Sequence, residues 1–165
     1  PVQRVSKEEA AYLLRKAFDG GITFFDTARS YTDSEEKLGY AFEGMRDKLF
    51  IATKTPSTTV EGFWKDLETS LRLLKTDYID VYQFHNPAFC PKPGDGTGLY
   101  EAMEEAKKQG KIRFIGITNH RLGVAEEAGG IVTITIVSII FTGILGNIVA
   151  EGWFKLVGIR EPIAK

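Results

Sequence analysis

The sequence contains little cysteine and no excess of charge of either sign. Its 165 residues include one cysteine, Cys90, so no disulfide can form within the chain and we expect a reducing, cytoplasmic compartment. The formal net charge of −1 gives no indication of a nucleic-acid partner. Histidine, cysteine, aspartate and glutamate do not occur at the spacing of metal ligands, so no metal site is predicted. Hydrophobic residues make up 43% of the sequence, which suits a globular domain with a sizeable core.

What the sequence does contain is a regular alternation of strand-like and helical patterns. Apolar runs typical of strands start about 30 residues apart, at 22–26, 49–53, 79–84 and 112–117. Amphipathic helical patterns lie before and between them, which is typical of a parallel sheet buried on both faces. No Gly-x-Gly-x-x-Gly follows a first strand, and this disfavours a doubly wound nucleotide-binding sheet. The predicted fold class is therefore α/β, a partial (β/α)8 TIM barrel.

Polar side chains stand at the carboxyl ends of these predicted strands. They are Asp26 and Tyr31 after the first strand, Lys54 after the second, His85 after the third, and Thr118 with Asn119 after the fourth. Because the carboxyl ends of the strands in a parallel barrel converge on one face, we expect these side chains to form one site. Any one of them alone would suit an ordinary structural residue. Their occurrence at successive strand ends favours a functional site.

This combination of residues suits proton transfer to an oxygen atom. We expect the Lys54 ammonium to lower the pKa of Tyr31 from its usual value of about 10, and Asp26 to hold Lys54 charged and oriented. His85 would hydrogen-bond a substrate oxygen or tune Tyr31. Such a site suits carbonyl reduction, in which Tyr31 protonates the oxygen as hydride reaches the carbon. A second interpretation is a barrel aldolase with Lys54 as Schiff-base nucleophile, although a neighbouring carboxylate keeps lysine charged and opposes imine formation.

Four motifs, in this order, resemble the aldo-keto reductase family. They are Gly21–Tyr31, Ala52–Lys54, Asp77–His85 and Gly110–Asn119. The resemblance covers about residues 5–128 and is to bacterial and archaeal members of the family. It implies NADP(H), or less often NAD(H), as cofactor and a small-molecule carbonyl substrate. It also implies a catalytic tetrad with Tyr31 as general acid, made up of Asp26, Tyr31, Lys54 and His85, with Thr118 and Asn119 contacting the nicotinamide amide.

The C-terminal residues 129–165 depart from this pattern. The run 131–150 is uncharged and long enough to span a bilayer as a helix, although Ile134–Val137 is more typical of a strand. We therefore divide the chain into a partial barrel, 1–128, and an unrelated apolar tail, 129–165. On this interpretation the C-terminal half of the family's barrel is missing, and we expect weak NADPH binding and impaired turnover. The alternatives are an inactive fragment and a product that associates with membranes or with itself.

Overall fold

The computed structural model describes residues 4–128 and 134–137, and in them the strands form one parallel sheet. The sheet has five strands in the order β1-β2-β3-β4-β5. Their bounds are Phe24–Asp26 for β1, Phe50–Thr55 for β2, Ile79–His85 for β3, Ile112–Asn119 for β4 and Ile134–Val137 for β5. Each strand pairs in parallel with the next one in sequence. The predicted α/β class, with parallel strands in the connectivity of a barrel, is confirmed.

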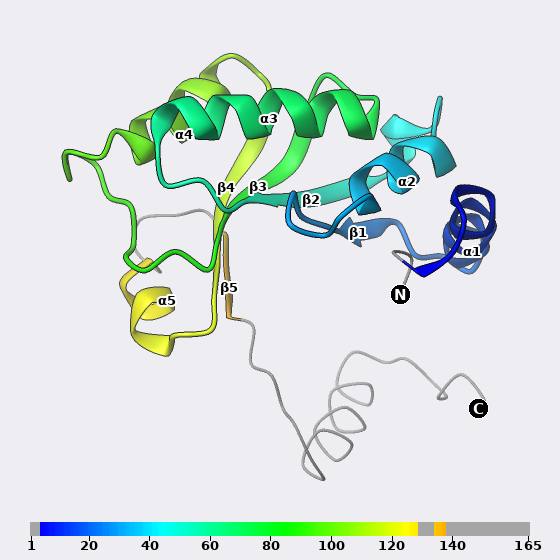
Figure 1. Cartoon of the computed structure of the whole chain (residues 1–165), viewed down its shortest axis with the longest axis horizontal. Coiled ribbons are helices and arrows are strands. Elements are labelled where there is room, and N and C mark those ends of the chain that lie inside the picture. Colours follow the sequence, from blue (N-terminus) through cyan, green and yellow to red (C-terminus); the bar gives the residue numbers. More distant parts are fainter. Residues whose placement is uncertain (1–3, 129–133, 138–165) are drawn as a thin grey trace, which may run out of the picture.

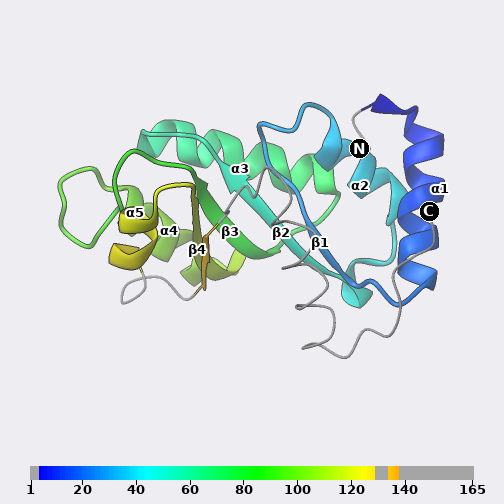
Figure 2. The same cartoon turned by 90° about the horizontal axis from the view of Figure 1, so that it is seen from below.

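Helices connect the strands and cover one side of the sheet (Figure 1). Their bounds are Lys7–Asp19 for α1, Ser34–Ala41 for α2, Val60–Leu74 for α3, Leu99–Lys108 for α4 and Leu122–Ala128 for α5. Capping side chains fix where two of them begin: the Ser6 hydroxyl accepts from the Glu9 amide, and the Thr59 hydroxyl accepts from the Gly62 amide. Seen from below in Figure 2, α1 lies beyond the β1 end of the sheet, where it packs against α2.

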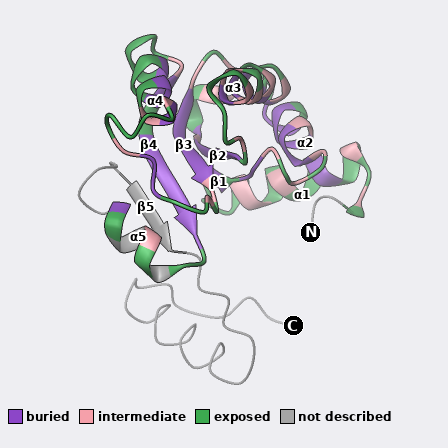
Figure 3. Cartoon of the chain, turned by 60° about the vertical axis from the view of Figure 1, so that its left-hand side comes forward, coloured by how far each residue is buried: buried purple, intermediate pink, exposed green. Residues whose placement is uncertain are grey.

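Alternation along β3 sorts its side chains onto two faces of the sheet. Tyr82 and Phe84 are buried against the helices, with ring centroids 5.6 and 6.4 Å from that of Phe63 on α3. Figure 3 shows the burial of this central strand. Since successive strand residues point to opposite faces, Gln83 and His85 lie on the other face. The candidate site is therefore built on the face of the sheet that the helices do not cover.

Two strands continue further than the sequence patterns predict. The predicted second strand ends at Thr53, but β2 continues to Thr55, and β4 continues to Asn119. The parallel ladder explains the extension, because Thr55 pairs with Phe84 and His85 pairs with Thr118. The polar residues at these ends therefore lie within the ladder, where neighbouring strands hold their backbones in place.

The strand predicted at Ile134–Val137 is confirmed as β5, which pairs with β4. The rest of the apolar run 131–150 lies outside the described residues, as does the remainder of the tail. The division of the chain at residue 128 therefore stays a prediction. In the part of the chain that the structure describes, none of the helices has both the length and the apolar character needed to cross a membrane.

Candidate active site

The predicted site residues lie side by side at the carboxyl ends of β1 to β4. Asp26 is the last residue of β1, His85 the last of β3 and Asn119 the last of β4, while Lys54 is the last but one of β2. Tyr31 follows in the loop between β1 and α2. The convergence expected of a parallel barrel is observed for the tetrad and Thr118, whereas the Asn119 side chain bonds to Pro87 and Arg121.

Lys54 and Asp26 form the ion pair at the centre of the site. The Lys54 ammonium donates to Asp26 Oδ2 at 2.5 Å and to the carbonyl oxygen of Thr27 at 2.7 Å. The Lys54 side chain is 3% exposed, whereas that of Asp26 is 40% exposed. A buried ammonium without a partner would be costly, so the carboxylate and the carbonyl together keep Lys54 charged and fixed.

Tyr31 and His85 complete the group around this ion pair. The Lys54 Nζ atom lies 5.3 Å from the centroid of the Tyr31 ring. The Tyr31 and His85 rings meet edge to face, with centroids 5.6 Å apart and an interplanar angle of 85°. The Arg29 amide donates to the Lys54 carbonyl at 3.0 Å, which ties the start of the Tyr31 loop to β2. All four predicted tetrad residues are thus brought together.

The electrostatics differ from the prediction at Tyr31. Burial raises the pKa of Tyr31 above its usual value of 10.0, and the Asp26 charge raises it further. The expectation that Lys54 lowers this pKa is therefore wrong. The physical reason is that Asp26 neutralises the Lys54 charge, and the ammonium lies against the tyrosine ring. Burial also lowers the pKa of His85 from 6.5, and Lys54 adds to that effect, so near neutral pH His85 is uncharged and Tyr31 is protonated.

Sequence reasoning missed Gln83, which connects the tetrad to Thr118. Gln83 is fully buried. Its Nε2 atom donates to Asp26 Oδ1 at 3.3 Å, and its Oε1 atom accepts from the Thr118 hydroxyl at 2.6 Å. The signal for it was available, because Gln83 lies two residues before His85 and therefore on the same face of a strand.

Asn119 braces the loops beside the site. Its Nδ2 atom donates to the carbonyl oxygen of Pro87 at 2.7 Å, and its Oδ1 atom accepts from the Arg121 amide at 2.8 Å. Asn119 is fully buried. With these two bonds made, its side-chain amide still has one N–H donor and one oxygen lone pair available. Its predicted contact with a cofactor stays a prediction.

Behind the tetrad, a buried carboxylate holds the Tyr31 loop against the sheet. Glu35 is 1% exposed and accepts hydrogen bonds from the hydroxyls of Thr53 at 2.6 Å and Ser70 at 2.7 Å. It also forms an ion pair with Arg29. These bonds connect α2, β2 and α3 with the loop that carries Tyr31, and so fix the tyrosine relative to its neighbours.

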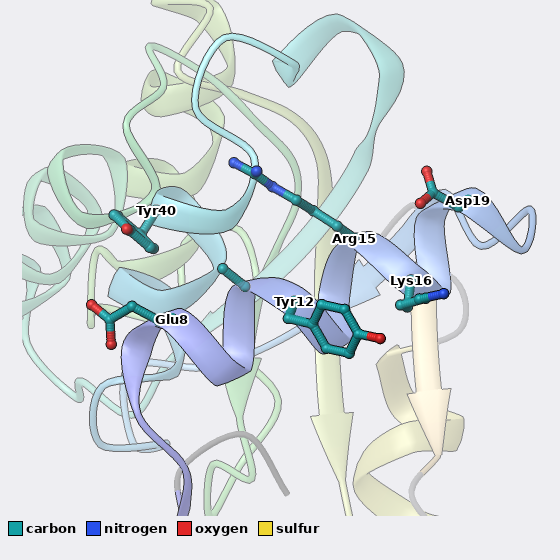
Figure 4. Close-up of a pocket in the computed structure, with 7 residues that line it drawn as sticks. Glu8, Tyr12, Arg15, Lys16, Asp19 and Tyr40 are labelled. Carbon is teal, nitrogen blue, oxygen red and sulfur yellow. The ribbon is translucent and has the colours of Figure 1, made fainter.

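A separate hollow of about 320 Å³ lies between α1 and α2, away from the tetrad (Figure 4). Three of its lining side chains are engaged: the Lys16 ammonium lies over the Tyr12 ring, and Arg15 Nε donates to the carbonyl oxygen of Ala41. The hollow includes none of the predicted site residues. No group of three or more potential metal ligands occurs among the described residues.

Comparison with known proteins gives one consistent result. The model of the aldo/keto reductase family matches residues 2–157. The uncharacterized oxidoreductase YqkF of Bacillus subtilis is 32% identical over 96% of this chain and 57% of its own length. Methylglyoxal reductase DkgB of Salmonella typhi is 37% identical over 70% of this chain and 44% of its own. The crystal structure of an aldo-keto reductase from Klebsiella pneumoniae in complex with NADPH has a TM-score of 0.64 at 33% identity, covering 73% of this chain and 42% of that one.

The matches also describe the extent of the similarity. The chain spans about half the length of these curated relatives, 57% of one and 44% of the other. The family match reaches residue 157, beyond residue 128, to which the resemblance was expected to extend.

Proposed function

The chain belongs to the aldo-keto reductase family, and from this premise we propose that it carries the catalytic residues of an NAD(P)H-dependent reductase that converts a carbonyl group into an alcohol. The observation that carries the proposal is the convergence of Asp26, Tyr31, Lys54 and His85 at the carboxyl ends of β1 to β3. An ion pair with a buried ammonium, a protonated phenol and a neutral imidazole then share a single site.

Each of these residues has a distinct task in proton transfer. Tyr31 is the general acid, since its raised pKa keeps the proton on the phenol at neutral pH. The Lys54 ammonium lies beside the Tyr31 ring, with its charge neutralised by Asp26. Asp26 orients Lys54, and His85, being neutral, is able to donate a hydrogen bond to the same oxygen.

The donor set beside the tetrad fits a nicotinamide carboxamide, which offers one carbonyl oxygen and one NH2 group. Thr118 and Asn119 lie next to the tetrad at the end of β4 and together provide hydroxyl and amide groups for such a partner. We therefore assign the cofactor as NADP(H), with NAD(H) as the alternative. When bound, it supplies the hydride. The relative from Klebsiella pneumoniae, whose structure contains NADPH, supports this choice.

The proposed substrate is a small-molecule aldehyde or ketone. The similarity to a methylglyoxal reductase supports a small carbonyl compound as the first probe. The aldolase alternative is disfavoured by the 2.5 Å contact between Lys54 and Asp26, because an imine forms only from an uncharged amine. Treatment with borohydride in the presence of methylglyoxal would label Lys54 covalently if that alternative were correct.

The test of the proposed function is NADPH binding followed by turnover. We expect the purified chain to bind NADPH weakly, with a small change in NADPH fluorescence, and to oxidise NADPH slowly in the presence of methylglyoxal. Tyr31→Phe should lower the reduction rate by about 10²–10⁴-fold, the usual worth of a general acid, while NADPH affinity changes little. Absence of NADPH binding, or full activity of Tyr31→Phe, would contradict the proposal.

A further inference from the structure

Gln83 occupies the centre of a hydrogen-bonded chain that runs between two parts of the site. In the sheet it pairs with Lys54 on one side and with Gly116 on the other. Its side-chain amide joins Asp26 to Thr118, and the whole residue is excluded from solvent. Because water cannot reach this amide, its orientation is set by its two protein neighbours.

Those neighbours permit only one orientation of the Gln83 amide. An ionised carboxylate accepts hydrogen bonds and cannot donate them, so the NH2 group of Gln83 faces Asp26. The amide oxygen then faces Thr118 at 2.6 Å. An amide oxygen can only accept, so the Thr118 hydroxyl must donate its single proton to Gln83. The Asp26–Lys54 ion pair thereby determines the direction of a hydrogen bond on the far side of Gln83.

From this geometry we infer that Gln83 is a positioning residue that restricts the Thr118 hydroxyl to accepting hydrogen bonds from a ligand. With its proton committed to Gln83, Thr118 offers only oxygen lone pairs to the site. It therefore recognises an N–H donor, and the matching group on the cofactor is the NH2 of the nicotinamide carboxamide. This inference rests on the proposed function for the identity of the ligand, but the orientation of Gln83 does not depend on it.

The orientation of Gln83 is testable in the chain without any cofactor. The Gln83 side-chain NH2 resonances, assigned by their loss in Gln83→Met, should exchange slowly with solvent. They should shift more in Asp26→Asn, which changes the acceptor of the NH2 group, than in Thr118→Val, which lies beside the amide oxygen. Thr69→Val is the matched control, since the Thr69 hydroxyl makes an exposed hydrogen bond to the Lys65 carbonyl within α3. Rapid exchange of the Gln83 resonances, or a larger shift in Thr118→Val than in Asp26→Asn, would overturn the inference.

Whether the Thr118 hydroxyl accepts a hydrogen bond from the cofactor is testable with two cofactors that differ in one group. Reduced 3-acetylpyridine adenine dinucleotide phosphate keeps the carbonyl of NADPH but has a methyl group where NADPH has NH2. We expect Thr118→Val to weaken NADPH binding by about fivefold, the worth of one hydrogen bond, and to leave binding of the analogue unchanged. If Thr118→Val weakened the binding of NADPH and of the analogue equally, Thr118 would not bind the NH2 group.

Gln83→Met separates positioning from a merely structural role. It removes the acceptor for the Thr118 proton, so Thr118 becomes free to donate to the carbonyl that both cofactors share. The preference for NADPH over the analogue should then fall about fivefold, whereas general damage to the site would weaken both equally and leave the ratio unchanged. An unchanged ratio would overturn the inference. If the unaltered chain bound neither cofactor, the proposed function would fail, and the resonances of Gln83 would still decide how Thr118 is oriented.

Discussion

The Tyr31 phenol keeps its proton to a higher pH than an ordinary tyrosine, because burial and then the Asp26 charge raise its pKa. The acid form is the one that donates a proton, so reduction should be level near neutral pH and fall only as the pH rises through a value above about 10. The ultraviolet absorbance of the phenolate, compared between the unaltered chain and Tyr31→Phe, measures this pKa directly. A midpoint below 10 would contradict the prediction.

Asp26→Asn is the companion variant for that titration. It removes a charge that raises the pKa of Tyr31, and it leaves the Lys54 ammonium without its neutralising partner. Both changes favour the phenolate, so the midpoint should be lower than in the unaltered chain. An unchanged midpoint would show that burial alone sets the pKa of Tyr31.

The placement of the site residues was predictable from one rule, whereas their interactions were not. Parallel strands bring their carboxyl ends together, and this rule located Asp26, Lys54 and His85 correctly. The direction of the Tyr31 pKa shift depended on distances that sequence does not contain, since Lys54 acts differently once Asp26 neutralises it. Gln83 was overlooked because it lies inside an otherwise apolar run, although its spacing from His85 marks the same face.

At the scale of elements, Asp80 joins three strands at the opposite end of the sheet from the site. Its carboxylate accepts from the Ile51 amide at 2.8 Å, from Arg46 at 2.5 Å and from Arg113 at 2.9 Å. Burial opposes ionisation of this fully buried residue, but these donors outweigh it and lower the pKa. The charged form of Asp80 therefore stabilises the folded chain.

We expect Asp80→Asn to lower the free energy of unfolding by about 3 kcal/mol, because it leaves buried donors and two guanidinium groups without their anion. The sign of the pH dependence follows from the lowered pKa. The contribution of Asp80 is present above about pH 4 and is lost as the pH falls through the folded-state value. Urea unfolding at several pH values measures both effects. Asp77→Asn, at an exposed position near the start of β3, should change little, and an equal loss there would refute the assignment.

Gly39 allows α2 to pack closely against the end of α3. A Cβ atom at this position would lie 2.1 Å from the Leu73 carbonyl oxygen and 2.8 Å from the Leu74 carbonyl carbon, and backbone cannot rotate away as a side chain can. Gly39→Ala should therefore destabilise the fold by about 1–3 kcal/mol. Gly123→Ala, at a helical position with open space, should be neutral or stabilise by up to about 1 kcal/mol. Urea unfolding measures both free energies. If Gly123→Ala were the more destabilising of the two variants, the close packing of α2 on α3 at Gly39 would be refuted.

The type and order of the elements were predictable, and their boundaries were less so. Apolar residues recur at different periods in strands and in helices, so the alternation of strands and helices is evident from the sequence pattern alone. The first strand was expected from Ile22, but β1 begins at Phe24, the first residue paired with β2. The residue at which a strand begins or ends depends on which residues of the neighbouring strand pair with it, and the local sequence pattern does not reveal that pairing.

At the scale of the whole molecule, the two faces of the sheet differ in character. One face packs against helices through residues such as Ile51, Tyr82 and Phe84. The opposite face carries the tetrad at the carboxyl ends of the strands, and a series of phenylalanines lies nearer their amino ends. The ring of Phe50 stacks on that of Phe24 with centroids 5.4 Å apart and on that of Phe114 at 6.3 Å. The reacting groups and an apolar surface thus share one side of the sheet.

This apolar surface gives a prediction about the behaviour of the chain in solution. Phe24 is 49% exposed and Phe114 is 37% exposed, yet parallel sheets are normally covered on both faces. We expect the purified chain to bind a hydrophobic dye and to self-associate through these rings. Because full burial of a phenylalanine contributes about 1.5–3 kcal/mol, Phe24→Ser combined with Phe114→Ser should raise the midpoint concentration of association at least about tenfold.

Sedimentation over a range of concentrations measures that association, with dye fluorescence as the second readout. Tyr12→Ser is the control, since Tyr12 is 61% exposed on α1 and lies apart from the phenylalanine series. It should leave both readouts unchanged, because the association depends on the sheet face and not on exposed aromatic area in general. A chain that stays monomeric and binds no dye would mean that its own residues cover the rings. In that case the double serine variant should instead lower the free energy of unfolding, since it would remove apolar contacts within one molecule.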